Sequence, residues 1–229
     1  MAYGQTGTGK TYTIVQELIP QSLNWIFQNK PVQDDIYFSC LQIYNEKLSD
    51  LLCPNNKVQM REKKNRFVVE RLVEEKVVNV QMGRDLISKC ENNRNIGSTS
   101  MNPYSSRSHA IYMYKIFHKE KGIFSTLYFV DLAGSERLKV LLYRYIFIKL
   151  IAKKSKIHND KYSETISINT SLTTLGKCII ALTEKRSTHV PYRESKLTKV
   201  LMETLSGNSM VSFIVNLSAK LGDIGKFQN

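Results

Sequence analysis

The sequence predicts an α/β domain in which helices flank a central, mostly β sheet. Segments rich in aromatic and β-branched residues alternate along the chain with segments of helical spacing. A glycine-rich loop near the start opens into one of the predicted helices. The 229 residues are enough for one large domain or two small ones with a sizeable core.

Strands are expected where β-branched and aromatic residues gather or alternate with polar ones. They are residues 35–44, 66–80 as one or two strands, 108–117, 125–134 and 210–218. The segments 108–117 and 125–134 are expected to be neighbours in the sheet, joined at Gly122.

Helices are expected where apolar residues recur at helical spacing. They are residues 11–30 with a break near Pro20, a short helix in 45–52, 83–97, 164–185 and 195–205. Because proline lacks the N–H that a helix interior needs, Pro20 should interrupt the first helix and Pro54 should close the second.

The composition narrows the possible partners and compartments. The chain has 33 Lys and Arg against 20 Asp and Glu, a formal net charge of +13. This excess favours an acidic partner, whether nucleic acid, anionic lipid or an acidic protein surface, without choosing among them. The four scattered cysteines indicate free thiols in a reducing compartment, not a zinc site or a disulfide framework.

No membrane segment or secretory signal is expected. The most apolar stretch, residues 140–152, contains Arg144 and Lys149 and is shorter than the roughly 20 residues of a membrane span. The first residues lead directly into a polar, glycine-rich loop, which is unlike a secretory signal.

That loop, GQTGTGKT at residues 4–11, fits the phosphate-binding pattern G-x-x-x-x-G-K-[ST]. Glycines allow successive backbone N–H groups to surround phosphate oxygens, and the positive end of the next helix points at them. Lys10 would bind the β- and γ-phosphates, and the Thr11 hydroxyl would bind Mg²⁺. The alternative is a chance glycine-rich turn. Only three residues precede the loop, so the strand that normally holds it is expected to be missing.

Two further motifs could complete a nucleotide site. FVDLAGSE at 129–136 is an apolar strand ending in Asp131, where nucleotide-hydrolysing proteins place a water-mediated Mg²⁺ ligand, and Gly134 could offer its N–H to a γ-phosphate. NPYSSRSH at 102–109 adds hydroxyls and an arginine. Each motif alone fits an ordinary turn or loop. Together the three predict a phosphate cradle, hydroxyls near a metal and an acid–base pair.

With these motifs the chain resembles the kinesin motor domain, whose phosphate loop, switch I and switch II they match. LQIYNEKLSDLL at 41–52 is similar to a strand–helix step of that family. INTSLTTLGKCIIAL at 168–182 is similar to its microtubule-facing helix, and HVPYRESKLTKVL at 189–201 to the loop and helix that follow. The resemblance spans residues 2 to about 218, apart from one internal block.

The resemblance implies ATP as the nucleotide and Mg²⁺ as the metal. Eight loop residues would hold the phosphates: Gly4, Gln5, Thr6, Gly7, Thr8, Gly9, Lys10 and Thr11. The ring of Tyr12 would pack against the adenine. Thr11 and Ser106 would approach the metal, with Asp131 acting through water.

Four residues are implied to take part in hydrolysis. Ser105 would touch the γ-phosphate or the attacking water. Arg107 and Glu136 would form a salt bridge that closes the two switches, and Glu136 would also relay a proton from the water. Gly134 would sense the γ-phosphate and so move the helix that begins near Glu164.

The implied partner is the microtubule, which Arg193, Lys196 and Lys199 would meet. Basic residues on a helix more often form a solvated face, but the resemblance favours contact with acidic tubulin. A nucleic acid would explain the charge equally well, yet no segment resembles a base-reading module, and no membrane contact is expected. The intact parent would hydrolyse ATP and step along, or depolymerise, microtubules, in the cytoplasm and cytoskeleton. The alternative is an inactive fragment or a non-catalytic protein that binds microtubules or another partner.

The chain also departs from the family pattern. It is expected to be a partial motor domain over 1–218 with a divergent tail at 219–229, lacking N-terminal strands, the last helix and the neck linker. Residues 139–152 are expected to be foreign to the domain, because deleting them restores a connection of the family's usual length. Only VQEL remains of the loop the family has between Ile14 and Ile19. These departures predict weak folding and little activity. The oligomeric state is not readable, although the parent could dimerise through a coiled coil outside this chain.

Overall fold

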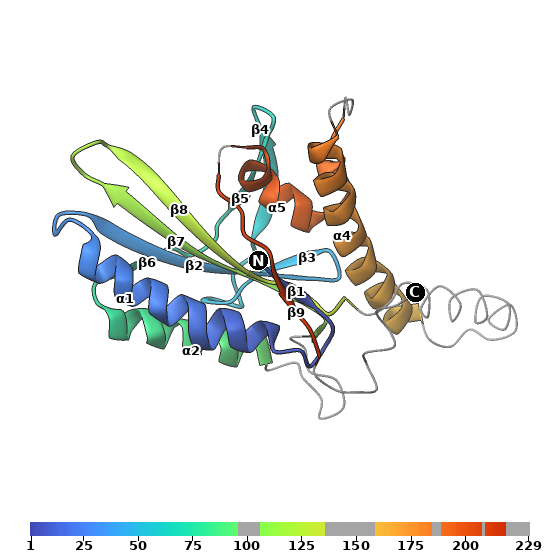
Figure 1. The fold of residues 1–229 in the computed structure, drawn as a ribbon, viewed down its shortest axis with the longest axis horizontal. Coiled ribbons are helices and arrows are strands. Elements are labelled where there is room, and N and C mark those ends of the chain that lie inside the picture. Colours follow the sequence, from blue (N-terminus) through green and yellow to red (C-terminus); the bar gives the residue numbers. More distant parts are fainter. Residues whose placement is uncertain (96–105, 136–158, 185–188, 208, 219–229) are drawn as a thin grey trace, which may run out of the picture.

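The computed structural model describes residues 1–95, 106–135, 159–184, 189–207 and 209–218. Seven of the described strands form one mixed sheet in the order β3–β2–β7–β8–β1–β9, with β6 paired to β2 (Figure 1). These strands are β1 (Ala2–Gly4), β2 (Asp35–Tyr44), β3 (Lys47–Asp50), β6 (Glu75–Val77), β7 (His109–His118), β8 (Ile123–Asp131) and β9 (Ile214–Asn216). A separate hairpin consists of β4 (Gln59–Lys63) and β5 (Arg66–Glu70). The predicted α/β class is therefore confirmed.

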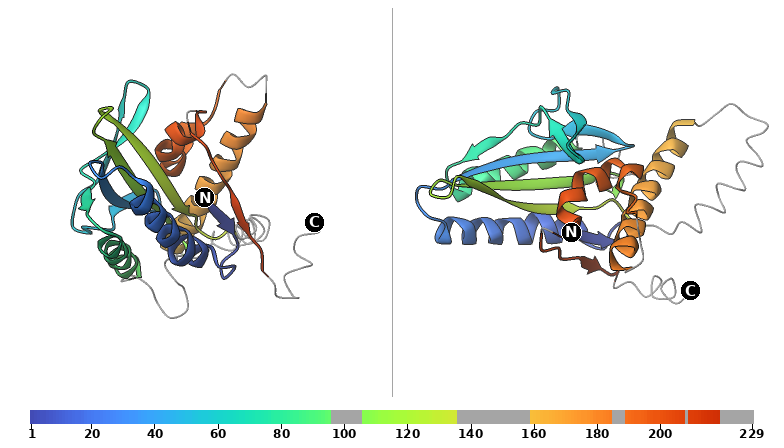
Figure 2. Two further views of the ribbon diagram at one scale, coloured as in Figure 1. Left: turned by 60° about the vertical axis from the view of Figure 1, so that its left-hand side comes forward. Right: turned by 90° about the horizontal axis from the view of Figure 1, so that it is seen from above.

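Helices cover both faces of the sheet. The described helices are η1 (Tyr12–Leu18), α1 (Ile19–Asn29), α2 (Val80–Asn95), α4 (Asn159–Thr183), η3 (Tyr192–Glu194) and α5 (Lys196–Leu205). Figure 2 shows α1 and α2 together on one side, with α4 and α5 on the other.

Two apolar cores follow from the alternation of side chains along the strands. On β2, Phe38 and Cys40 pack with the buried residues of η1, α1 and α2. Leu41 and Ile43, which point to the opposite face of the same strand, pack with the buried residues of α4 and α5. The central strands are therefore buried on both faces, which fixes the register of the sheet and the positions of the loops at its ends.

The strand that holds the phosphate loop is present, contrary to the expectation from the sequence. β1 lies between β8 and β9 and runs parallel to both, although it has only three residues. Ala2 is paired with Asp131 and Gly4 with Asn216, and the Met1 carbonyl accepts a hydrogen bond from the Ile214 N–H at 2.8 Å. This pairing carries the loop to the same end of the sheet as Asp131.

The predicted helix within 45–52 is wrong, because this segment forms a tight hairpin to β3. Asn45 and Glu46 have φ of 49° and 54°, the left-handed conformation that two-residue hairpin turns require. Leu48 then pairs with Ile43 across the hairpin. The Asp50 carboxylate, fully buried, accepts hydrogen bonds from the N–H groups of Leu52, Cys53 and Val73.

The predicted break near Pro20 is also wrong, because the helix changes form there without interruption. The π-helical turn η1 passes directly into α1, and Pro20 lies in the first turn of α1. A wider turn before a proline relieves the conflict between its ring and the preceding carbonyls. The segment 66–80, expected to form one or two strands, forms the two strands β5 and β6, whereas β4 was not expected.

Candidate nucleotide site

The phosphate loop is a compact turn closed by its own polar groups. Gly7 and Gly9 have φ of 81° and 89°, which side chains other than glycine rarely allow. The Gln5 carbonyl accepts hydrogen bonds from the Thr8 hydroxyl at 2.8 Å and from Lys10 Nζ at 2.9 Å. Lys10 is only 6% exposed. A buried ammonium group therefore sits within a turn rich in backbone donors.

Thr11 and Asp131 meet at the end of the sheet, as the sequence motifs require. The Thr11 hydroxyl donates to Asp131 Oδ2 over 2.6 Å, and Asp131 is fully buried. Its other oxygen, Oδ1, is buried without a hydrogen-bond partner in the described part of the chain. A buried carboxylate oxygen is costly when unpaired, and hard oxygen atoms are the ligands that Mg²⁺ and its water shell prefer. This pair of residues therefore fits the predicted metal.

Backbone hydrogen bonds join the two switch motifs to each other and the second of them to the phosphate loop. The Gly134 N–H donates to the Ser106 carbonyl at 2.8 Å, and the Ser135 N–H donates to the Gly4 carbonyl at 3.0 Å. The three segments are far apart in sequence, yet they converge here because β1, β7 and β8 are neighbours or near neighbours in one sheet.

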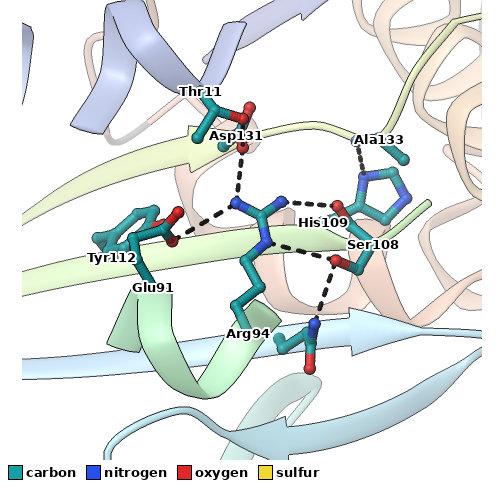
Figure 3. Close-up of polar contacts among 9 residues, drawn as sticks. Thr11, Glu91, Arg94, Ser108, His109, Tyr112, Asp131 and Ala133 are labelled. Carbon is teal, nitrogen blue, oxygen red and sulfur yellow. Dashed lines mark hydrogen bonds and ion pairs between the residues drawn. The ribbon is translucent and has the colours of Figure 1, made fainter. Parts of the chain in front are cut away.

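Arg94 is a site residue that the sequence analysis missed (Figure 3). It lies in the last turn of α2 with 1% exposure, and its Nη1 donates to Asp131 Oδ2 at 2.7 Å. Its Nη2 donates to the Ser108 carbonyl at 3.0 Å, and Glu91 lies 3.7 Å from Nη1. Despite the opposing effect of burial, nearby negative groups raise the pKa of Arg94 above its usual value, so this group is a permanent cation. A lone arginine in a helical pattern normally indicates a solvated face, so the sequence offered no signal for it.

His109 is the second residue that the sequence did not single out. Its Nδ1 accepts the Ala133 N–H at 3.0 Å, and its Nε2 lies 2.8 Å from the Ser171 hydroxyl of α4. Because Nδ1 is an acceptor, Nε2 carries the proton and donates to Ser171. Burial, with the nearby charges of Arg94 and Lys10, lowers the pKa of His109 to about 3. A neutral imidazole thus joins the second switch motif to α4.

Two of the predicted site residues lie outside the described residues, and two others are partly or largely exposed. Ser105 and Glu136 lie outside the described residues, so the Arg107–Glu136 salt bridge stays a prediction. Arg107 is half-buried. Tyr12 is 61% exposed, and its hydroxyl donates to Glu17, a hydrogen bond that raises the pKa of Tyr12. Its ring is therefore accessible beside the loop.

The three residues predicted to meet tubulin lie together on η3 and α5, next to the β4–β5 hairpin. Arg193 is exposed and forms an ion pair with Glu62 of β4. The guanidinium of Arg193 and the Lys199 ammonium lie 5.9 Å and 5.6 Å from the centre of the Phe67 ring. Lys196, at the first position of α5, donates its backbone N–H to Glu46.

A phosphate loop at the end of a parallel strand, opposite a buried aspartate on the neighbouring strand, defines an α/β protein of the phosphate-loop nucleotide-binding class. Within this class the particular family follows from comparison with known sequences. The sequence profile of the kinesin motor domain matches residues 1–226. The chain belongs to the kinesin motor domain family.

Individual relatives agree with this assignment. The kinesin heavy chain of Neurospora crassa is 37% identical over 95% of this chain, and the kinesin-like protein klp-20 of Caenorhabditis elegans is 37% identical over 94%. The matches cover 24% and 34% of those proteins, so the chain spans a quarter to a third of the relatives' length.

Solved structures show the same fold. The structure of a fast kinesin superposes with a TM-score of 0.76 at 36% identity, covering 95% of this chain and 63% of that one. The motor domain of the kinesin-like protein Kar3 from Saccharomyces cerevisiae gives 0.76 at 33% identity, covering 99% of this chain and 69% of the other. Among the described residues, no helix has the length and apolar character to cross a bilayer.

Proposed function

We propose that this chain binds Mg²⁺ and ATP at the loop formed by residues 4–11 and couples ATP hydrolysis to microtubule binding. One observation carries the proposal: the phosphate loop, Asp131 and the Gly134–Ser106 backbone contact converge at one end of the sheet. Membership of the kinesin motor domain family supports ATP as the nucleotide and the microtubule as the partner. It also supports a location on the cytoskeleton, in the cytoplasm.

The loop residues would grip the phosphates. Lys10 Nζ, which donates to the Gln5 carbonyl, can turn to the β- and γ-phosphates over a short distance because its ammonium already lies inside the loop. The hydroxyls of Thr11 and Ser106 and the free oxygen of Asp131 would hold the metal, the last through water. Bound Mg²⁺ neutralises developing negative charge on the phosphates. The exposed ring of Tyr12 would pack against the adenine.

Hydrolysis would depend on the positions of the two switch motifs. The Gly134 N–H, which donates to the Ser106 carbonyl, would turn to the γ-phosphate and so exchange a protein acceptor for a ligand oxygen. Ser105 would orient the attacking water, and closure of Arg107 onto Glu136 would allow Glu136 to take its proton. The His109 bridge to Ser171 gives this movement a direct connection to α4.

The test is phosphate release by the chain with and without polymerised tubulin. We expect microtubules to stimulate release strongly in the intact parent and weakly in this chain. Both Lys10→Ala and Glu136→Ala should abolish the stimulation, because they remove the phosphate grip and the proton acceptor. Stimulation that persists in both variants would refute the assigned site.

The tubulin-facing surface requires a separate experiment. We expect Arg193→Ala combined with Lys196→Ala to weaken cosedimentation with microtubules, more strongly at low salt because exposed charges are less screened there. Arg84→Ala, which removes an exposed arginine of α2, is the matched control and should leave cosedimentation unchanged. Equal binding by the double variant and the control would place the contact elsewhere.

A further inference from the structure

The buried cation Arg94 contacts two groups of the nucleotide site at once (Figure 3). Its Nη1 donates to Asp131 Oδ2 and its Nη2 to the Ser108 carbonyl, two residues beyond Ser106. Both Arg94 and Asp131 have side chains with no exposed surface. A buried ion pair is costly to desolvate, and well-packed apolar residues could fill the same space without that desolvation cost. Its presence here points to a role in placing one of its partners.

The contacts on Asp131 divide its two oxygens. Oδ2 accepts from both Thr11 at 2.6 Å and Arg94 at 2.7 Å, whereas Oδ1 has no partner among the described residues. Two donors on one oxygen fix the rotation of the carboxylate and direct the other oxygen away from them. Losing a group that orients a metal ligand typically lowers the metal affinity by about 10- to 100-fold.

The position of Arg94 is itself fixed from three sides. Helix α2 ends at Asn95, so the guanidinium extends from a helix C-terminus, where a cation is favourable. Glu91, one turn earlier, accepts a hydrogen bond from Tyr112 and lies beside Nη1. The Ser108 hydroxyl accepts from Gln42 of β2 at 3.1 Å and lies 3.4 Å from Arg94 Nε. Arg94 therefore ties α2, the start of β7 and the end of β8 together at one point.

We propose that Arg94 is a positioning residue for the metal of the nucleotide site. By holding Asp131 Oδ2 it presents Oδ1 to the water shell of the metal, and by holding the Ser108 carbonyl it keeps Ser106 at a fixed distance from that oxygen. This inference rests on the proposed function, because it assigns Arg94 to the same Mg²⁺-dependent site.

The experiment measures how strongly bound nucleotide depends on Mg²⁺, independently of hydrolysis. The chain is saturated with the fluorescent nucleotide mant-ADP, and its retention is followed as free Mg²⁺ is lowered with EDTA. Arg94→Lys keeps the charge but cannot contact Asp131 and Ser108 together. We expect it to raise the Mg²⁺ concentration for half-maximal retention by about 10- to 100-fold, the usual effect of losing such a partner.

Two control variants separate positioning from stability. Glu91→Gln disturbs the same buried cluster but leaves the Arg94–Asp131 pair, so it should lower the unfolding temperature with less than a twofold change in the Mg²⁺ requirement. Arg84→Gln, on the exposed face of α2, should change neither quantity. A folded Arg94→Lys with a normal Mg²⁺ requirement, or a Glu91→Gln that raises it equally, would overturn the proposal. Mg²⁺-independent retention by the unaltered chain would overturn the proposed function as well.

A measurement on the unaltered chain covers the case in which Arg94→Lys does not fold. Arg94 is the one fully buried arginine among the described residues, so its Nε–H should exchange slowly and be distinct in a ¹⁵N spectrum. Adding Mg²⁺ to the chain saturated with ADP should shift this signal. A signal that does not move would contradict the placement of Arg94 next to the metal site.

Discussion

Gly4 is the residue at which β1 turns into the phosphate loop, and its surroundings leave no room for a side chain. A Cβ atom there would lie 2.3 Å from the Asn216 carbonyl oxygen and 2.8 Å from the Thr8 hydroxyl. The first of these atoms belongs to the backbone of β9, which is held in register with β1 and cannot move alone. The glycine is therefore required by packing between strands as well as by the loop.

We expect Gly4→Ala to destabilise the chain by about 1–3 kcal/mol, the usual cost of overpacking, and to weaken nucleotide binding because the loop must shift. Urea unfolding measures the first effect. Gly176→Ala is the control: a Cβ there meets nothing within 4 Å, and alanine favours a helix, so α4 should gain up to ~1 kcal/mol. Equal stability of the two variants would contradict the packing described for Gly4.

His109 makes stability depend on pH in a direction fixed by its buried, neutral state. Its pKa is lowered to about 3, against about 6.5 in the unfolded chain, so the unfolded chain binds the extra proton first as pH falls. The stability that neutral, buried His109 contributes is fully present above about pH 6.5 and is lost as pH falls toward 3. From pH 7 to 5 the expected loss is roughly 2 kcal/mol. His109→Gln should flatten this part of the profile in urea unfolding, and an unchanged profile would contradict the assignment.

At the scale of elements, the strands were predictable wherever the local pattern decided the outcome. β2 matches its predicted range, and the ends of β7 and β8 lie within one and three residues of theirs. The prediction of a helix within 45–52 is wrong because contacts with distant residues overrule the local pattern. One of these is the Val73 N–H, which donates to Asp50 from 23 residues away.

Asp50→Ala tests this explanation of the hairpin. It would leave the N–H groups of Leu52, Cys53 and Val73 without their carboxylate acceptor, and hydrogen bonds to charged groups contribute about 1.5–3 kcal/mol each. We expect a loss of at least ~2 kcal/mol in the free energy of unfolding. Asp85→Ala on the exposed part of α2 is the control and should change it by no more than about 0.5 kcal/mol.

The candidate site likewise contains some residues that the sequence predicts and others that it does not. The loop, Asp131 and Gly134 were predictable because short motifs encode them, whereas Arg94 and His109 were not. Their roles arise from complete burial and from partners on other elements, which spacing along one helix or strand does not encode. The roles of Ser105 and Glu136 stay predictions.

At the level of the whole molecule, β8 is paired along its full length on one side but, among the described residues, only at its end on the other. β7 pairs with β8 from Ile123 to Asp131, but in the described part of the chain β1 pairs with it at Asp131 alone. Ile123 and Phe124 are 52% and 53% exposed. An unpaired, apolar strand edge invites association between chains.

We therefore expect the free energy of unfolding to be below about 5 kcal/mol, the lower end of the usual range. We also expect the chain to aggregate in a concentration-dependent way. Urea unfolding and light scattering measure these quantities. Thr126→Lys, which places a charge in the exposed half of β8, should reduce the scattering, since charges on an edge strand oppose pairing. A free energy of unfolding near 10 kcal/mol, without aggregation, would contradict this expectation.

Calorimetric titration of the chain with ATP in the presence of Mg²⁺ is the sharpest test of the proposal that residues 4–11 and Asp131 form one site for Mg²⁺ and ATP. We expect one site per chain whose affinity falls at least tenfold on Lys10→Ala and on removal of Mg²⁺. Absence of binding by the unaltered chain, or binding that Lys10→Ala leaves intact, would contradict it.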